Sequence, residues 1–424
     1  MASVATKISV LPQLTCPNCW KQFGPEQILW LSTSPELLGD SHLGDEYPKR
    51  FLPTRFSVHG NAIDESGAEC QELACPHCHL PIPRSCLSLA SFYVSIAGSP
   101  ACGKSYFLAS MTWQLRQVAA KYFGCAFGDA DPGFNKTLQQ YEEDQFFTKD
   151  ENELVKLAKT EEYGSMYQSV EMNGQAYTFP KPFLFTLRPG PSHPKAIQAK
   201  QKSRVICLYD NAGESYLSGK DTSTNQVTRH LAVAHSYFYC FDPTQDPRLR
   251  KRLRGRTNDL QVTEATVTTR QETLLYELIA RVRKHTNLDE TERTKRPLFV
   301  ICTKYDAWWP LLGEKVLELP IKKSSKRKDF SVLDLDRVFE ISSIVKNILG
   351  EVSPELVGAA ESFSENVYYI PVSATGSAPE RDEQGITVGI RPKNIQPMWC
   401  EVPLLCALAV WSGGLIPYTR SEMA

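Results

Sequence analysis

The chain has 424 residues with 47 basic and 48 acidic side chains, giving a formal net charge of −1 at pH 7. This length can bury a large core and hold one big domain plus a smaller one, or two to three ordinary domains. The near-zero charge argues against a dedicated nucleic-acid-binding or membrane-surface protein, because such proteins need an excess of basic side chains.

The N-terminal sequence lacks the long apolar stretch of a signal peptide, and the apolar run at 402–411 is too short to span a bilayer. We therefore expect a cytoplasmic protein without a membrane span. The 13 cysteines, several of them inside apolar strand-like runs, fit reduced thiols better than a disulfide framework. The compartment is accordingly expected to be reducing.

Residues 1–90 differ from the rest of the chain, since they hold two Cys-x-x-Cys pairs and many prolines but no long amphipathic helix. Cys16 and Cys19 form one pair, and Cys75 and Cys78 form the other, so four thiolates could bind one tetrahedral Zn²⁺. This pattern predicts a small zinc-ribbon-like region with a structural metal, although the interval between the pairs is unusually long. Free thiols and redox pairs are the alternatives. Further possible ligands are Cys70, Cys86, His77 and His79.

An apolar strand at 91–98 leads through a glycine-bracketed turn into a predicted helix at 104–123, with the spacing G-x-x-x-x-G-K-[ST] of a phosphate-binding loop. The residues expected to contact nucleotide phosphates are Gly98, Ser99, Pro100, Ala101, Cys102, Gly103, Lys104, Ser105 and Tyr106. Bare backbone amides and the helix N-terminus would bind phosphate. Lys104 would reach the β and γ phosphates, and the Ser105 hydroxyl would bind Mg²⁺. The alternative is a glycine-rich turn followed by an exposed lysine.

Strands and helices alternate after this turn. Further strands are predicted at 183–189, 203–210, 236–242, 296–306 and 365–374, and further helices at 269–285, 335–351 and 402–411. The alternation indicates an α/β fold with a doubly wound, mostly parallel sheet, in which ligands bind at the carboxyl ends of the strands.

Three stretches interrupt the alternation, at about 125–180, 214–258 and 375–400. Basic clusters at 248–256 and 322–328 could contact an acidic partner, but solvated loops are the commoner outcome for such runs. Asp129 and Asp131 could form a second acidic site near the nucleotide, or they could belong to a polar loop with an Asx-type turn.

Polar residues follow three of the later strands, in the segments LYDNAGE, CTKYDAW and VSATG. Together with the phosphate loop, and in this order, they resemble the G1, G3, G4 and G5 motifs of the Ras-like GTPases, within the TRAFAC class of P-loop GTPases. The resemblance covers about residues 91–414. It implies a Ras-like fold that binds GTP or GDP with Mg²⁺ and hydrolyses GTP. Asp210 would hold Mg²⁺ through water, and the Gly213 amide would sense the γ-phosphate.

The resemblance also implies a guanine-binding end of the site. Asp306 would accept hydrogen bonds from the guanine N1–H and 2-amino group, while Lys304 would pack over the base. Ser373 and Ala374 would line its oxygen side. Thr303 stands where the family usually has asparagine, and it keeps a polar side chain at that position. We therefore expect the preference for guanine to be retained.

Two further departures concern catalysis and the phosphate loop. Glu214 stands where well-studied members have a glutamine that orients the attacking water, and a carboxylate there would repel the γ-phosphate. We therefore expect slow hydrolysis unless another residue or a partner assists. Pro100 and Cys102 replace the small residues common in the loop. The switch I threonine is not placed by the sequence; the candidates are Thr137, Thr148 and Thr160.

The sequence thus predicts a zinc-ribbon-like region at 1–90 followed by a P-loop GTPase domain with insertions at 91–424. This combination is similar to bacterial GTPases predicted to work in pairs, so a protein effector or a second GTPase would be the partner, and nucleic acid is not expected. The leading hypothesis is a regulatory GTPase switch. The alternative is a zinc-ribbon adaptor that binds GTP for stability or assembly without useful turnover, while Asp306 disfavours an ATPase.

Overall fold

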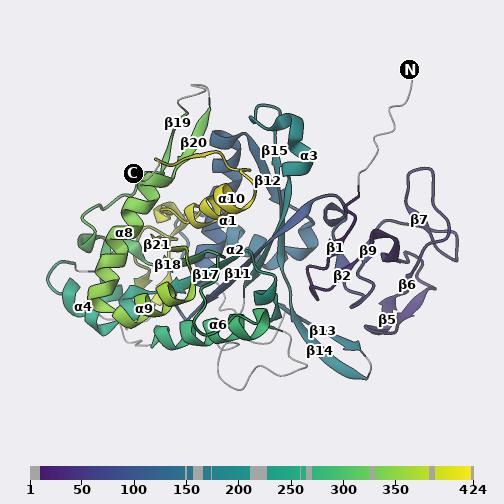
Figure 1. Cartoon of the computed structure of the whole chain (residues 1–424), viewed down its shortest axis with the longest axis horizontal. Coiled ribbons are helices and arrows are strands. Elements are labelled where there is room, and N and C mark those ends of the chain that lie inside the picture. The colour runs from purple at the N-terminus through teal and green to yellow at the C-terminus, as the bar shows by residue number, and fades with distance from the viewer. Residues whose placement is uncertain are drawn as a thin grey trace.

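The structure, a computed structural model, describes residues 10–148, 150–155, 166–172, 174–210, 227–257, 259–263, 270–324, 330–381 and 387–421. Seven strands form the central sheet (Figure 1), in the spatial order β12 (Cys125–Asp129), β15 (Phe183–Pro189), β16 (Arg204–Asp210), β11 (Ala90–Gly98), β17 (Ser236–Phe241), β18 (Leu298–Cys302) and β21 (Val367–Pro371). The four neighbouring pairs from β16 to β21 are parallel, whereas β12–β15 and β15–β16 are antiparallel. The predicted α/β class and mostly parallel sheet are confirmed.

Helices pack around this sheet (Figure 1). Those in the described part of the chain are α1 (Lys104–Phe123), α2 (Lys136–Phe146), α3 (Ala199–Lys202), α4 (Pro247–Leu253), α5 (Leu260–Thr263), α6 (Gln271–Thr286), α7 (Tyr305–Trp308), α8 (Leu335–Val352), α9 (Pro354–Phe363) and α10 (Val402–Trp411). The bounds of α1 and α10 are those predicted from the apolar pattern. Helix α1 ends because Gly124 adopts a left-handed φ of 60°, which glycine tolerates without strain.

Two parts of the sheet region differ from the sequence prediction. The strand predicted at 296–306 ends at Cys302, because Lys304 takes a left-handed φ of 55° and α7 begins at the next residue. The stretch after α1, expected to interrupt the alternation, instead supplies the edge strand β12, helix α2 and a long hairpin. The hairpin consists of β13 (Tyr167–Met172) and β14 (Gln175–Pro180).

The described residues before β11, 10–89, form a region that we call the head, at one end of the longest axis (Figure 1). It contains short strands and two 3₁₀ turns but no α-helix among its described residues. Its strands are β1 (Leu14–Thr15), β2 (Gln22–Phe23), β3 (Leu29–Leu31), β4 (Leu38–Asp40), β5 (Gly44–Pro48), β6 (Arg50–Phe51), β7 (Ala62–Ile63), β8 (Glu69–Cys70), β9 (Leu73–Ala74) and β10 (Pro81–Ile82).

The head covers one face of part of the central sheet. In β11, Phe92 and Val94 belong to the main core beneath the helices, whereas Tyr93 between them packs with the head. The same alternation in β16 directs Cys207 and Tyr209 toward the head. Central strands therefore have two buried faces, as parallel sheets require, but the head replaces a helical layer on one of them.

Small strands complete the fold near the C-terminus: β19 (Ile321–Lys323), β20 (Ser331–Asp334), β22 (Glu380–Arg381), β23 (Thr387–Gly389) and β24 (Tyr418–Thr419). The basic cluster at 248–256 forms surface ion pairs in part, since Arg248 contacts Asp246 at 2.7 Å and Arg252 contacts Glu351. Of the second cluster, at 322–328, residues 325–328 lie outside the described residues.

Candidate nucleotide and metal sites

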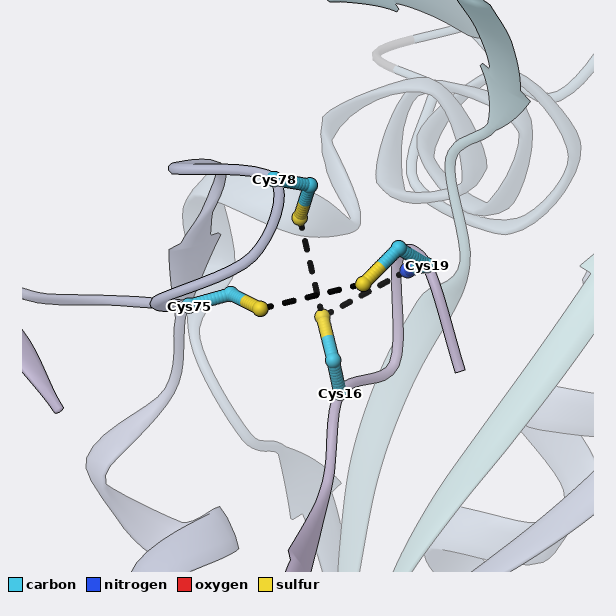
Figure 2. Close-up of side chains that lie close together, drawn as sticks. All are labelled: Cys16, Cys19, Cys75 and Cys78. Atoms are coloured by element: carbon cyan, nitrogen blue, oxygen red, sulfur yellow. Dashed lines mark hydrogen bonds between the residues drawn. The ribbon is translucent and has the colours of Figure 1, made fainter. Parts of the chain in front are cut away.

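The two Cys-x-x-Cys pairs of the head come together in a single cluster (Figure 2). The Sγ atoms of Cys16 and Cys78 are 3.8 Å apart, and those of Cys19 and Cys75 are 3.7 Å apart. Four sulfurs at tetrahedral corners, each about 2.3 Å from a Zn²⁺, would be separated by about 3.8 Å. The donor type, number and spacing therefore fit one zinc ion.

Both pairs form the same kind of turn. In the first, the backbone N–H of Trp20 donates to the Cys16 carbonyl at 3.0 Å, and in the second His79 N–H donates to the Cys75 carbonyl at 3.0 Å. Trp20 and His79 each take a left-handed φ, of 60° and 58°. The N–H of Asn18 also points at the Cys16 sulfur at 3.3 Å, which favours a thiolate.

Burial raises the pKa values of the Cys16 and Cys78 thiols well above their ordinary value. A cation reverses this preference, because a metal ion binds thiolate rather than thiol. The cluster is thus chemically suited to a metal, and metal binding would release protons from it.

The four further residues considered as ligands lie outside this cluster. The Cys70 sulfur is 3.6 Å from an Asp64 oxygen, and burial alone raises the pKa of Cys86 to about 12. His77 Nε2 lies 3.2 Å from the Gln22 carbonyl oxygen. His79 belongs to a second group with Asp40 and His42, in which its Nδ1 is 2.7 Å from Asp40 Oδ2.

The predicted phosphate loop joins β11 to α1. Gly103 caps the helix with φ 86°, and Ala101 also takes a positive φ of 59°. A Cβ on Gly98 would lie 2.8 Å from the Cys240 carbonyl oxygen and 2.9 Å from the Cys102 sulfur, so this position has room only for glycine. The Ser99 hydroxyl donates to Gln271 at 2.9 Å, and Gln245 donates to the Pro100 carbonyl at 3.3 Å.

Two predicted site residues, at the start of α1 and at the end of β16, form an ion pair. Lys104 Nζ lies 2.9 Å from Asp210 Oδ1, with side chains 8% and 2% exposed. Burial by itself would lower the pKa of Lys104, but the Asp210 carboxylate outweighs it and holds that pKa above its ordinary value. Ser105 follows Lys104 in the first turn of α1, and the partly buried Tyr106 packs against the main core. Gly213 and Glu214 lie outside the described residues.

Thr303, just after β18, forms a hydrogen bond to the predicted phosphate loop. Its hydroxyl donates to the Cys102 carbonyl at 2.7 Å and also lies 3.2 Å from the Phe241 carbonyl oxygen. Thr303 therefore joins the end of β18 to the loop between β11 and α1. Lys304 follows, and its Nζ contacts Asp242 Oδ2 at 2.6 Å.

Asp306 is surrounded by donors. Its Oδ1 accepts from the Ser373 hydroxyl at 2.5 Å, and its Oδ2 accepts from Gln261 Nε2 at 3.1 Å. Burial raises the pKa of this carboxyl, although the Ser373 hydrogen bond opposes the shift. The backbone carbonyl of Ala374 accepts from Ser110 in α1 at 2.8 Å, so the segment after β21 is joined to the helix of the phosphate loop.

Three residues of this region were not singled out from the sequence: Asp242, Gln261 and Gln271. Asp242 directly follows the apolar strand β17, much as Asp210 ends the apolar strand β16, and this pattern could have identified it. Gln271 links Asp242 to Ser99, since its Oε1 accepts from both the Asp242 N–H and the Ser99 hydroxyl at 2.9 Å. Neither glutamine has a local sequence signal.

The suggestion of a second acidic site at Asp129 and Asp131 is not supported. Asp129 pairs with Arg116 at 3.2 Å and accepts from Asn135 at 2.6 Å. Asp131 accepts from the Gly133 N–H at 2.8 Å, which is the Asx-type turn considered as the alternative. Among the switch I candidates, Thr137 lies in α2 and Thr148 caps a local turn, while Thr160 is outside the described residues.

The geometry defines an α/β protein with charged side chains gathered at the carboxyl edge of a mostly parallel sheet, and with a four-cysteine cluster that could bind zinc. No protein-family model matches the chain. None of the helices in the described part of the chain has the length and apolarity needed to cross a bilayer.

The chain is similar to SaeC of Mycolicibacterium smegmatis, a protein provisionally named as an ESX-1 scaffolding and assembly protein, with 25% identity over 259 residues. The match covers 56% of this chain and 59% of the relative, so the chain spans less than two thirds of that relative. A crystal structure of Sup35 complexed with GDP matches 70% of this chain and 41% of the other, with 12% identity. Its TM-score of 0.22 is too low to support an argument.

Proposed function

We propose that the chain is a guanine-nucleotide switch that binds GTP or GDP with Mg²⁺ at the carboxyl edge of the sheet and hydrolyses GTP slowly. The observation that carries this proposal is the buried 2.9 Å ion pair between Lys104, the first residue of α1, and Asp210, the last residue of the strand β16 that runs parallel to β11. A lysine that begins a helix after a glycine-bracketed loop and faces an aspartate on the next strand suits a magnesium–phosphate group.

In the nucleotide-bound protein, Lys104 would leave Asp210 for the β and γ phosphates. Asp210 would then face Mg²⁺ through water, and the Ser105 hydroxyl would be a direct ligand. Asp306 would accept from the guanine base, with Thr303 joining its loop to the phosphate loop by the 2.7 Å hydrogen bond to Cys102. Slow turnover is expected because Glu214 replaces the water-orienting glutamine of related GTPases.

We assign residues 1–90 to a zinc-binding region and residues 91–424 to the nucleotide-binding domain. One Zn²⁺ would be held by Cys16, Cys19, Cys75 and Cys78, and the sulfur separations of 3.7 and 3.8 Å support this. A small region without α-helices gains much of its stability from such a metal. The partner would be a protein effector or a second GTPase. A protein partner agrees with the name of the relative, which describes a scaffolding and assembly protein.

The decisive experiment compares GTP, ATP and XTP binding by nucleotide-free protein. Two charge-assisted hydrogen bonds of about 1.5–3 kcal/mol each should favour GTP over ATP by about 10² to 10⁴ in affinity. Asp306→Asn offers an amide to the 2-oxo group of xanthine, so it should lose GTP affinity and gain XTP affinity. Asp334→Asn removes the same charge from the end of β20, where Asp334 pairs with Lys322 at 2.9 Å, and should leave the preference unchanged.

Equal binding of ATP and GTP by the wild-type protein, or an Asp306→Asn variant that still prefers GTP to XTP, would overturn the assignment of residues 303–306. Multiple-turnover phosphate release separates the switch from an adaptor that binds nucleotide without hydrolysis. The expected rate is about 10⁻⁴ to 10⁻² s⁻¹, the range of switch GTPases without an activator.

A further inference from the structure

The first cysteine turn of the head contacts the strand that ends at Asp210. Trp20 directly follows Cys19, and its indole Nε1 donates to the Tyr209 hydroxyl at 3.0 Å. That hydroxyl in turn donates to the Pro17 carbonyl at 2.6 Å. Tyr209 is fully buried and immediately precedes Asp210 in β16. Both hydrogen bonds of its hydroxyl therefore go to residues of the metal-binding turn.

The Tyr209 ring is also held from its other sides. It stacks on His230 with ring centroids 4.7 Å apart and an interplanar angle of 10°. His230 Nδ1 lies 2.6 Å from the Ser95 hydroxyl in the neighbouring strand β11. The Trp20 ring contacts His230 as well, at 6.1 Å. A displacement of Trp20 should therefore displace the Tyr209 side chain as well, because buried groups cannot exchange their hydrogen-bond partners for water.

The same turn also holds the hairpin inserted between α2 and β15. Gln168 of β13 donates to the Asn18 side-chain oxygen at 3.0 Å, and Phe179 of β14 meets the Trp20 ring edge-on at 5.9 Å. Residues 17–20 therefore contact the sheet and the hairpin at once. Their conformation depends on the cluster, since Cys16 precedes them, Cys19 is one of them, and the Asn18 N–H points at the Cys16 sulfur.

We propose that Trp20 and Tyr209 are positioning residues through which the metal-bound head sets the placement of Asp210, and thereby the Mg²⁺-dependent part of nucleotide binding. This inference rests on the proposed function. When the metal leaves, the turn relaxes, and the buried Tyr209 hydroxyl must either follow Pro17 and Trp20 or lose its partners. Because Tyr209 and Asp210 are consecutive in a strand, movement of the first changes the position of the second relative to Lys104.

A matched pair of variants isolates this route. Tyr209→Phe removes the hydroxyl that contacts Pro17 and Trp20 but keeps the ring against His230. Tyr93→Phe removes a hydroxyl that donates to the Thr15 carbonyl at 3.2 Å, so it also breaks one hydrogen bond between the head and the sheet. The two rings are neighbours, 6.3 Å apart, but Tyr93 lies far from the carboxyl end of its strand. Both variants should retain one zinc per chain.

The first measurement is the gain in GDP affinity on adding Mg²⁺, with zinc-loaded protein and with protein stripped by a chelator that is then removed. In the wild type and in Tyr93→Phe, zinc removal should reduce this gain about fivefold, the effect of losing about one hydrogen bond. Tyr209→Phe should show the reduced gain while zinc-loaded, with no further change on stripping. Equal behaviour of the two variants, or no effect of zinc on the wild type, would overturn the proposal.

The second measurement is amide hydrogen exchange in residues 204–210 without nucleotide. Zinc removal should accelerate this exchange in the wild type. In Tyr209→Phe the exchange should already be fast while zinc is bound. Equal exchange rates in zinc-loaded Tyr209→Phe and Tyr93→Phe would refute the positioning role. If the wild type binds no GDP, the proposed function fails, while this exchange result still decides whether the head positions the end of β16. If Tyr209→Phe does not fold, Trp20→Phe takes its place in both measurements, because it removes the indole N–H that donates to the Tyr209 hydroxyl.

Discussion

Gln261 donates a hydrogen bond to the carboxylate of Asp306, which we expect to recognise guanine. Replacing Gln261 by alanine is therefore expected to strengthen nucleotide binding. Both Asp306 oxygens have donors in the structure, Oδ1 from Ser373 at 2.5 Å and Oδ2 from Gln261 at 3.1 Å. Guanine would supply two N–H donors to the same carboxylate. The Gln261 amide must therefore leave Oδ2 before the base can bind with full hydrogen bonding.

The size of the effect follows from the hydrogen bond that is lost in the free protein. A hydrogen bond to a charged group contributes about 1.5–3 kcal/mol, and water that enters the Gln261→Ala variant would replace much of it. We therefore expect a net gain of about 1 kcal/mol, which lowers the GDP dissociation constant about fivefold. ATP binding should not change, because adenine has no donors that match this carboxylate.

Isothermal titration calorimetry of nucleotide-free protein with GDP and ATP measures this effect. A pH near 8 is suitable, because burial raises the pKa of Asp306 and the carboxylate must be ionised. Leu260→Ala is the control, since Leu260 lies beside Gln261 on α5 with 36% of its surface exposed. Unchanged or weaker GDP binding in Gln261→Ala would refute the idea that the glutamine competes with the base.

Three other predictions test different parts of the molecule. Lys104→Ala should weaken GTP binding about 100-fold or more. It should also lower the free energy of unfolding by about 3–5 kcal/mol, because Asp210 is left buried without its lysine partner. Unchanged GTP affinity in an equilibrium binding assay would contradict the assignment of the phosphate loop. Metal analysis should find one zinc per chain, lost in Cys16→Ser together with a lower melting temperature, and protein purified without chelator that contains no zinc would exclude this site. Burial raises the pKa of Glu401 from 4.5 to about 7, so the folded protein binds more protons than the unfolded chain, and stability should fall as pH rises from about 4.5 to 7. Glu401→Gln should remove this fall and be about 3 kcal/mol more stable at pH 8 in urea unfolding, whereas parallel pH profiles would disprove the effect.

The elements that could be predicted from the sequence are those with strong local signals. The uninterrupted apolar residues of β16 and of α10 identified both elements, because a segment buried on every side has few polar positions. The glycine spacing of the loop between β11 and α1 was also readable, because backbone geometry requires glycine there, as the 2.8 Å approach of Cys240 to a Cβ at Gly98 illustrates; its role in phosphate binding stays a prediction. The cysteine spacing likewise identified all four members of the cluster.

The parts that could not be predicted depend on contacts between distant segments. Gln271 joins Ser99 and Asp242 from the start of α6, and Gln261 reaches Asp306 from a four-residue helix. A glutamine in a polar stretch has no pattern that distinguishes these positions from solvated ones. The edge strand β12 was also missed, because its five residues include a glycine and pair with only one neighbour.

The head and the sheet bury surfaces that neither could bury alone. Tyr93, Cys207 and Tyr209 are at most 4% exposed, and the head packs against this face of β11 and β16. The head in turn consists of strands of two to five residues, too short to enclose a core of their own. A metal that stabilises the head therefore also stabilises one face of the sheet. Because side chains alternate along a strand, a residue held on that face adjoins one that faces the charged site, and this alternation brings Tyr209 and Asp210 together.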